Sequence, residues 1–306
     1  MIRFCFRLFV ILFCTTSMVQ AQVKKLNTFN IKNTSDLKEF FKYTPDRIPL
    51  ICGHRGGAEK GFPENSIATL ENTLNKMHAF FEIDPRLTKD SVIVILHDAT
   101  LDRTTTGNGK LSDYTWEEVK QLKLKDPMGN VTEYRIHTLD EILQWSRNKT
   151  IIMIDKKDVP LPMILEAINR NKAESYVLVS SYHVEEAVFY HKNNKNIMFE
   201  AFIKNQKQFD DYEASGIPWS NIVAYFGQPR SKEFSDALHA KGVMTMIYTT
   251  PVMEKIKDKG ERVQAYQTAI HTGGDILLSD RVAEVSDAIK PYIPLKSKKW
   301  SFFRKN

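Results

Sequence analysis

Histidine, arginine, lysine and carboxylate side chains follow several short apolar segments of this sequence. His54 and Arg55, for example, come directly after the apolar run that ends at Gly53. A surface loop needs glycine and proline in order to turn, but it does not need an imidazole beside a guanidinium. The residues whose types suit chemistry are His54, Arg55, Glu64, Glu82, Asp84, His97, Asp155 and Lys157. Together they offer proton donors and acceptors, oxygen ligands and fixed positive charges.

The acidic members of this set favour a bound cation. Glu82, Asp84 and Asp155 would repel one another if the fold brought them together with no cation between them. The sequence has no cysteine cluster and no His-x-x-x-His helix, so the ligands would all be oxygens. Oxygen ligands suit a hard divalent ion, and we expect one such cation, either Mg²⁺ or Ca²⁺.

The basic members extend this site to an anion. Arg55 and Lys157 would add positive charge beside the cation, and the combination is suited to bind phosphate. Two histidines near a bound phosphate can share proton transfer, because one takes a proton from a nucleophile while the other gives one to the leaving alkoxide. The pattern therefore predicts cleavage of a phosphate ester by His54 and His97, with the acid and base roles left open.

The elements that must position these residues are short apolar, β-branched runs separated by segments of helical period. The runs are 49–53, 80–84, 92–96, 150–154, 176–180, 197–203, 221–226, 243–249 and 275–278. Strands that alternate with helices are typical of a parallel sheet built from βαβ units. We therefore expect an α/β fold, a (β/α)8 TIM barrel, although nine runs are one too many for eight strands.

The excess run is explained by a hairpin. The gap between 80–84 and 92–96 is too short for the crossover that parallel neighbours need, so these two runs should pair antiparallel. A turn centred between Asp90 and Ser91 would place Asp84 opposite His97 and make both side chains face the metal site. In a TIM barrel the chemistry lies at the carboxyl ends of the strands, which is where the candidate residues occur in the sequence.

The N-terminal residues suggest export. Residues 1–21 have a basic start at Arg3 and Arg7 and an apolar stretch from Leu8 to Met18, which is typical of a signal peptide. We expect a periplasmic or extracellular protein, with an uncleaved anchor as the alternative. The formal charge of +6 falls to +4 when Arg3 and Arg7 are removed, and no basic stripe indicates a nucleic-acid partner.

The remaining boundaries follow from composition. Residues 22–48 form an N-terminal extension, whose Phe40, Phe41 and Tyr43 should cover the amino end of the barrel, with a lid as the alternative. The barrel should span 49–290, with an insertion at about 99–137. Residues 291–306 form a basic tail, expected to be solvated and frayed, with weak contact to an anionic membrane surface as the alternative. Cys52, the one cysteine after the signal peptide, should be buried, and the oligomeric state is left open.

Several motifs, in this order, resemble the glycerophosphodiester phosphodiesterase family. They are HRGG…PENS, FEIDPRLTKDSVIVILHDATLDRTTTGNG, HTLDEIL, IDKK and GGDILLSDR, and they span about Ile51 to Arg281. The resemblance implies a TIM barrel with a small insertion and a small glycerophosphodiester substrate, cleaved to an alcohol and glycerol 3-phosphate. The roles it implies are acid–base catalysis for His54 and His97, metal binding for Glu82, Asp84 and Asp155, phosphate contacts for Arg55 and Lys157, and support of the first loop by Glu64.

Two positions depart from the family's pattern. Asp155 stands where a glutamate is usual, so the cation must lie nearer that strand or bind through water. Tyr248-Thr249 replaces the usual Trp-Thr, which makes Tyr248 a substrate-binding residue with an altered packing surface. Two other functions stay open: a phospholipase C- or D-like barrel acting on intact phospholipid, which would want an exposed apolar rim, and a non-catalytic barrel that binds phosphorylated ligands.

Overall fold

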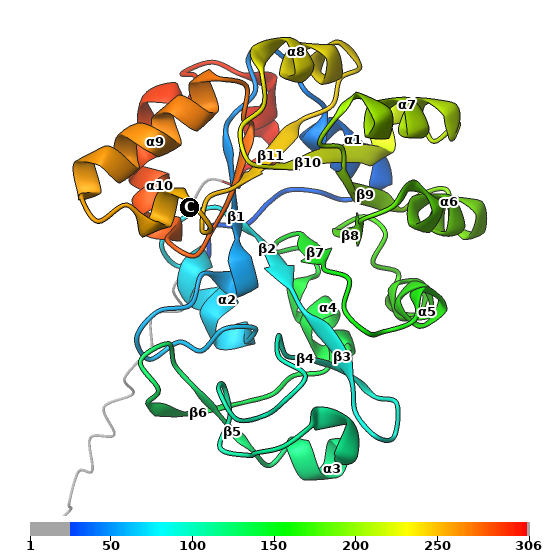
Figure 1. Ribbon diagram of the computed structural model, residues 1–306, viewed down its shortest axis with the longest axis vertical. Helices are drawn as coiled ribbons and strands as arrows, with labels where there is room; N and C mark the ends of the chain where they lie inside the picture. Colours follow the sequence, from blue (N-terminus) through cyan, green and yellow to red (C-terminus); the bar gives the residue numbers. More distant parts are fainter. Residues whose placement is uncertain (1–24, 305–306) are drawn as a thin grey trace, which may run out of the picture.

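Eight parallel strands close into a barrel at the centre of the molecule (Figure 1). The structure is a computed structural model, and it describes residues 25–304. The barrel strands are β1 (Leu50–Gly53), β2 (Phe80–Ile83), β7 (Ile152–Ile154), β8 (Val177–Ser181), β9 (Met198–Phe202), β10 (Ile222–Gly227), β11 (Thr245–Tyr248) and β12 (Ile276–Ser279). They follow one another around the barrel in chain order, and β12 closes it by pairing with β1. The predicted TIM barrel is confirmed.

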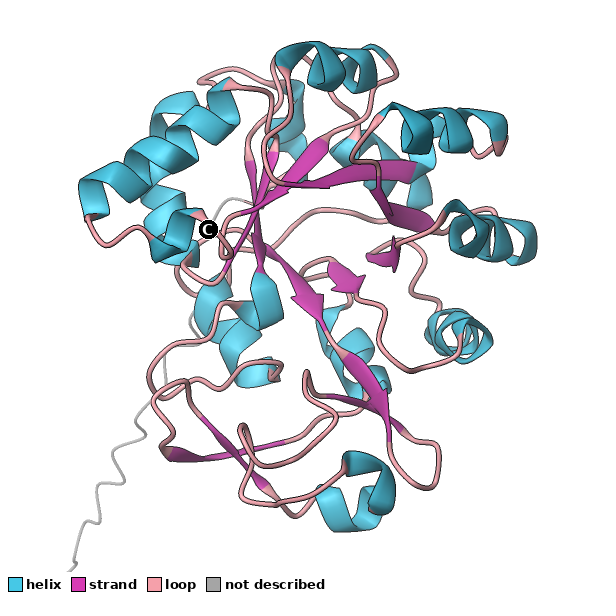
Figure 2. Ribbon diagram, viewed as in Figure 1, coloured by secondary structure: helices cyan, strands magenta, loops and turns pink. Residues whose placement is uncertain are grey.

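A helix follows each barrel strand and covers its outer side (Figure 2). The outer helices are α2 (Ile67–Leu74), α4 (Leu139–Ser146), α5 (Leu161–Asn171), α6 (Val184–Asn193), α7 (Gln206–Ala214), α8 (Lys232–Ala240), α9 (Lys259–His271) and α10 (Val282–Ile289). Helix α4 begins at a capping box in which Thr138 accepts from the backbone N–H of Glu141 and Glu141 accepts from that of Thr138. None of the helices in the described part of the chain is long and apolar enough to cross a membrane.

The alternation of side chains along the strands separates two cores. Outward residues such as Ile152 and Ile154 pack against the helices in the larger core. Inward residues such as Met153, Leu178 and Cys52 fill the barrel, and Cys52 is fully buried as predicted. The same inward face carries the polar side chains toward the carboxyl end of the barrel.

The predicted antiparallel hairpin is present, but its register was wrong by one residue. It is formed by β3 (Pro85–Leu87), which continues the chain beyond β2, and β4 (Ile93–Ile95). Pro85 pairs with Ile95, and Asp84 therefore lies opposite Leu96, whose N–H donates to the Asp84 carbonyl (2.8 Å). The reason is the turn, which has three residues between Thr88 and Val92 rather than two and ends at Ser91 with a positive φ of 62°.

The insertion forms a small layer beside the barrel. It contains the helix α3 (Trp116–Val119) and the antiparallel pair β5 (Lys123–Lys125) and β6 (Val131–Arg135). Its own apolar cluster includes Leu101, Leu111, Val119 and Ile136 together with Leu96, which follows the hairpin. The insertion is therefore packed directly onto the segment that carries His97.

Both ends of the described chain cover the amino end of the barrel. Phe40 and Phe41 of α1 (Thr34–Phe41) are buried in the inner core, which confirms that the N-terminal extension covers this end. Phe29 forms an antiparallel bridge with Phe303, and the Lys299 side chain is buried with its ammonium donating to the Glu39 carbonyl. Up to residue 304 the expectation of a frayed tail is therefore wrong, because Phe302 and Phe303 pack against the inner core, while Leu295 and Trp300 are exposed. The predicted signal peptide lies outside the described residues.

Candidate active site

A cavity of about 220 Å³ opens at the carboxyl end of the barrel. Its lining residues are His54, Arg55, Glu82, His97, Met153, Asp155, Lys157, Tyr182, Glu200, Phe202, Tyr225, Tyr248 and Leu278. Most residues predicted from the sequence are therefore in one place. Of the others, Asp84 lies in one cluster with Glu82 and Asp155, and Glu64 accepts a hydrogen bond from Arg55.

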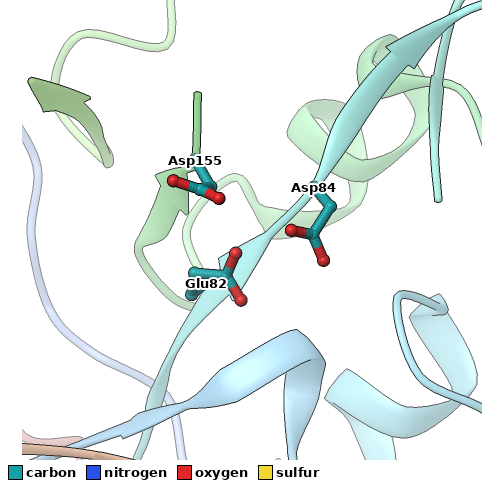
Figure 3. A group of neighbouring side chains, drawn as sticks. All are labelled: Glu82, Asp84 and Asp155. Atoms are coloured by element: carbon teal, nitrogen blue, oxygen red, sulfur yellow. The ribbon is translucent and has the colours of Figure 1, made fainter. Parts of the chain in front are cut away.

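Three carboxylates converge at this end of the barrel (Figure 3). Glu82 is in β2, Asp84 directly follows it, and Asp155 directly follows the neighbouring strand β7. One oxygen from each lies within 4.8 Å of the other two, and Glu82 and Asp84 are only 4% and 1% exposed. The parallel pairing of β2 with β7 brings them together, since it aligns the carboxyl ends of the two strands.

The charges in this cluster are not balanced. Burial, together with the nearby charges of Asp84 and Asp155, raises the pKa of Glu82 well above its usual value. Burial also opposes ionisation of Asp84, but the Lys157 charge, a hydrogen bond from Asn65 and the Arg55 charge together hold its pKa below its usual value. Lys157 Nζ lies 3.0 Å from Asp84 Oδ1 and 2.6 Å from Asp155 Oδ2.

The donor set fits a hard divalent cation. Three carboxylates share a space with an excess of negative charge, and Asp84 Oδ1 is buried without a well-directed hydrogen bond although Lys157 is near. A carboxylate oxygen can accept from more than one partner, so Asp84 Oδ1 keeps capacity for a bound cation. Asp155 is fixed on its other side by the Tyr182 hydroxyl, which donates to Oδ1 (2.6 Å).

Arg55, just after the carboxyl end of β1, is held in a strained backbone conformation. Its φ of 51° is in the left-handed region, which is unusual for a residue with a side chain. This conformation lets its N–H donate to Glu82 Oε2 (3.0 Å), while its guanidinium contacts Glu64 Oε1 (3.2 Å) and lies 3.5 Å from Asp84 Oδ2. The Arg55 guanidinium and the Lys157 ammonium both line the cavity, where an anion would meet two positive charges.

His54 is oriented by an acid that sequence reasoning had not assigned. Its Nδ1 is 2.7 Å from Asp280 Oδ1, and its Nε2 lies 3.9 Å from Glu82 Oε2 and 3.3 Å from the Tyr248 hydroxyl. Burial opposes ionisation of Asp280, but the hydrogen bond and charge of His54, the hydrogen bond from Thr250 and the Arg55 charge together lower the pKa of Asp280. With Nδ1–H bonded to Asp280, Nε2 is the nitrogen left for a substrate.

His97 has a matching arrangement on the insertion side. Its Nδ1 is 2.7 Å from Asp98 Oδ1, and Arg103 donates to both Asp98 (2.6 Å) and Glu64 (2.8 Å). Hydrogen bonds from Arg103 lower the pKa of Asp98, so this carboxylate stays ionised. Glu64, predicted to be a supporting residue, thus binds both Arg55 and Arg103. Arg103 also binds Asp98, which in turn holds His97.

Asp280, Asn65, Asp98, Tyr182 and Glu200 were not among the predicted site residues. Asp280 directly follows β12, so the rule that identified Asp155 could also have identified it. Asn65 lies within the HRGG…PENS motif, and its side chain donates to Asp84 Oδ2 (2.7 Å). Glu200 is the single acid within the apolar run of β9, and an acid in a buried strand could have been identified as a candidate site residue from the sequence.

Known proteins share the sequence pattern and the fold of this chain. The model of the glycerophosphoryl diester phosphodiesterase family matches residues 54–282. The crystal structure of a glycerophosphoryl diester phosphodiesterase from Parabacteroides distasonis is 50% identical with a TM-score of 0.90, covering 92% of this chain and 100% of that one. That of an Oleispira antarctica phosphodiesterase in complex with the product sn-glycerol-3-phosphate is 21% identical with a TM-score of 0.59, covering 79% and 97%.

A curated relative carries the same name. The glycerophosphodiester phosphodiesterase of Caldanaerobacter subterraneus subsp. tengcongensis is 34% identical over 142 residues, which are 44% of this chain and 58% of that protein. The match thus spans little more than half the length of that relative. The names of these relatives support the enzyme class predicted from the sequence. The chain belongs to the glycerophosphoryl diester phosphodiesterase family.

Proposed function

We propose that the protein hydrolyses small glycerophosphodiesters to an alcohol and glycerol 3-phosphate. The observation that carries this proposal is a pair of histidines, each hydrogen-bonded to an aspartate through Nδ1, at one cavity with Arg55 and Lys157. Family membership supports the reaction class, and the Oleispira antarctica relative has sn-glycerol-3-phosphate bound as its product.

Glu82, Asp84 and Asp155 would hold one divalent cation, either Mg²⁺ or Ca²⁺. When bound, this ion would neutralise the excess negative charge of the cluster and polarise the phosphate oxygens. Asp155, one methylene shorter than the usual glutamate, is held toward the cavity by Lys157 and Tyr182.

The roles of the remaining residues follow from their positions. Arg55 and Lys157 bind the phosphate, because they place two positive charges against the cavity. During hydrolysis one histidine takes a proton at Nε2 from the nucleophile, either water or a neighbouring hydroxyl of the substrate, as its oxygen bonds to phosphorus. The other histidine gives a proton to the leaving alkoxide as the phosphorus–oxygen bond breaks. Where the substrate hydroxyl attacks, water then opens the cyclic phosphate to give glycerol 3-phosphate. Asp280 and Asp98 hold the two imidazoles in the tautomer that leaves Nε2 free.

The size of the cavity favours a small substrate over an intact phospholipid. Its volume of about 220 Å³ is below the ~300 Å³ at which sites for drug-sized ligands begin. Half of its ten polar lining residues are Arg, Lys, Asp or Glu. The large apolar side chains exposed in the described chain, such as Met128, Val188 and Leu295, do not line it. The presence of both histidines and all three carboxylates argues against a barrel that only binds ligands.

The proposal is tested by the products formed from glycerophosphocholine, glycerophosphoethanolamine, glycerophosphoinositol and intact phosphatidylcholine, with and without a chelator. We expect glycerol 3-phosphate from at least one glycerophosphodiester, none from phosphatidylcholine, and complete loss of turnover after chelation that Mg²⁺ or Ca²⁺ restores. Full turnover in protein shown to be free of metal would contradict the metal site. Release of phosphatidic acid or diacylglycerol would support the phospholipase alternative instead.

We also propose that the protein is exported to the periplasm or beyond the cell, on the strength of the N-terminal sequence alone. Cell fractionation and the N-terminal residue of the mature protein test this. Retention of Met1 on a cytoplasmic protein would contradict it.

A further inference from the structure

A buried glutamate inside the barrel has no part in the mechanism above. Glu200 lies in β9 between Met198, which belongs to the inner core, and Phe202, which lines the cavity. Alternation along the strand directs all three side chains into the barrel. Glu200 is 3% exposed and itself lines the cavity. An acid at this depth, among methionine, leucine and aromatic side chains, is costly unless it has a partner.

The protein supplies only part of that partner. Ser180 lies opposite Glu200 in the pairing of β8 with β9, and its hydroxyl donates to Oε2 of the glutamate. Among residues 25–304 this is the one hydrogen bond that the Glu200 carboxyl group makes. A carboxyl group has two oxygens and can make several hydrogen bonds, so most of its capacity is left for a group in the cavity.

The surrounding side chains indicate which kind of group this is. The rings of Tyr182 and Tyr225 each lie 4.3 Å from that of Phe202, so an aromatic wall stands beside the acid. Such a wall with an acid would suit a quaternary ammonium ion. Here, however, the Lys204 ammonium already lies 4.5 Å from the Phe202 ring and 5.1 Å from the Tyr225 ring.

A second cation in this region would be repelled by Lys204, and by Arg55 and Lys157 at the same cavity. A hydroxyl group meets no such penalty, and it can donate to the carboxyl oxygen while the rings pack against the carbon chain that bears it. Burial raises the pKa of Glu200 to about 8, which is consistent with a neutral partner for this group.

We propose that Glu200 determines specificity by hydrogen-bonding a hydroxyl of the substrate's glycerol moiety while Arg55 and Lys157 hold the phosphate. The inference rests on the proposed function, and it identifies the hydroxyl-bearing substituent of the diester as the part held inside the barrel. The cationic or neutral head group of the substrate would then lie toward the open end of the cavity.

The experiment compares two ligands that differ only in their hydroxyls. Competitive inhibition constants are measured for sn-glycerol 3-phosphate and for propyl phosphate with the wild-type protein and with Glu200→Leu. We expect Glu200→Leu to raise the inhibition constant of sn-glycerol 3-phosphate by about tenfold or more, the scale of one lost hydrogen bond to an acid. The inhibition constant of propyl phosphate should stay within about twofold of the wild-type value. Met198→Leu, on the same strand and of similar volume, should change neither constant.

Glu200→Gln serves if the leucine variant does not fold. Glutamine keeps the shape of the side chain and one acceptor oxygen. We therefore expect a smaller loss of affinity for sn-glycerol 3-phosphate and again no loss of affinity for propyl phosphate. An equal loss for both ligands, or no loss for either, overturns the proposal. A changed KM for glycerophosphocholine with an unchanged constant for sn-glycerol 3-phosphate also overturns it, because the acid would then serve the head group. Failure of the wild-type protein to hydrolyse any glycerophosphodiester is a separate result, which rejects the proposed function itself.

Discussion

Buried acids occur at both ends of the barrel, and their surroundings are opposite. At the amino end, Asp275 directly precedes β12 and is fully buried. It contacts the Arg47 guanidinium, lies 2.9 Å from His239 Nε2 and accepts from the N–H of Thr245 (2.8 Å). One carboxylate there has two basic partners. At the carboxyl end, three carboxylates share the charges of Lys157 and Arg55, which lie 3.0 Å and 3.5 Å from the two oxygens of Asp84.

The difference shows how to separate structural from functional charge in one fold. Asp275 is satisfied by the protein, so its interactions contribute to stability and leave nothing for a ligand. The cluster at the other end is under-satisfied, so it is unfavourable in the empty protein and favourable once a cation and an anion complete it. Variants at the two ends should therefore affect different measurements.

The largest effect is expected for the catalytic histidines. His54→Ala and His97→Ala should each lower turnover by about 10² or more, the usual result of removing a positioned acid or base. Their melting temperatures should change little. The matched control is His239→Ala at the amino end, which should lower the melting temperature and leave turnover per folded molecule unchanged. Near-normal turnover in either alanine variant of the first pair would remove that histidine from the mechanism.

The second prediction concerns the free energy of unfolding. Asp275→Asn should destabilise the protein by about 3 kcal/mol, because it leaves the Arg47 charge without its buried partner. Glu82→Gln should abolish activity but stabilise the metal-free protein, since an amide avoids the cost of ionising a buried acid beside Asp84 and Asp155. Denaturant unfolding of both variants in chelator tests this contrast. A loss of stability in Glu82→Gln as large as that in Asp275→Asn would show that the two ends do not differ as described.

The smallest effect should come from replacing Asp126, an acid that belongs to neither the Asp275 site nor the carboxylate cluster. Asp126 accepts from the backbone N–H groups of Gly61, Met128 and Asn130, and hydrogen bonds from Asn130 and Gly61 lower its pKa from 3.8 to about 2. Since the folded-state pKa is depressed, its stabilising contribution is present above pH 3.8 and is lost as the pH falls toward 2. Asp126→Asn should flatten the fall in melting temperature over that range. An unchanged pH profile would mean that these bonds do not stabilise the ionised form.

Much of this arrangement could be predicted from the sequence, because it follows from strand order. The apolar runs identified the barrel strands, and residues such as His54, Asp84 and Asp155 had to meet because parallel strands end at one edge. The capping box at Thr138 and the burial of Cys52 are similarly local properties, which the types of neighbouring residues are enough to indicate.

The parts that were missed depend on backbone detail or on contacts far apart in the chain. The hairpin register depends on Ser91 adopting a left-handed conformation, which a serine seldom does. His97 reaches the cavity because β4 ends at Ile95, so the alternation of the strand no longer sets its direction. The partnership of Asp280 with His54 joins residues that are 226 positions apart, and no local pattern reports it.

The bridge between the two ends of the described chain has a consequence for biosynthesis. Asn30 N–H donates to the Phe302 carbonyl (2.8 Å) and Arg304 N–H to the Thr28 carbonyl (3.0 Å), so the first described residues are held by nearly the last. On a translating ribosome the amino end of the barrel therefore cannot be completed until residues 302–304 have left the exit tunnel. Until then Phe29 and Phe40 lack part of their cover, and such exposed apolar surface is what chaperones recognise in unfinished chains. This end of the barrel should therefore close after the rest, and a ribosome that stalls before residue 302 would leave the molecule open there.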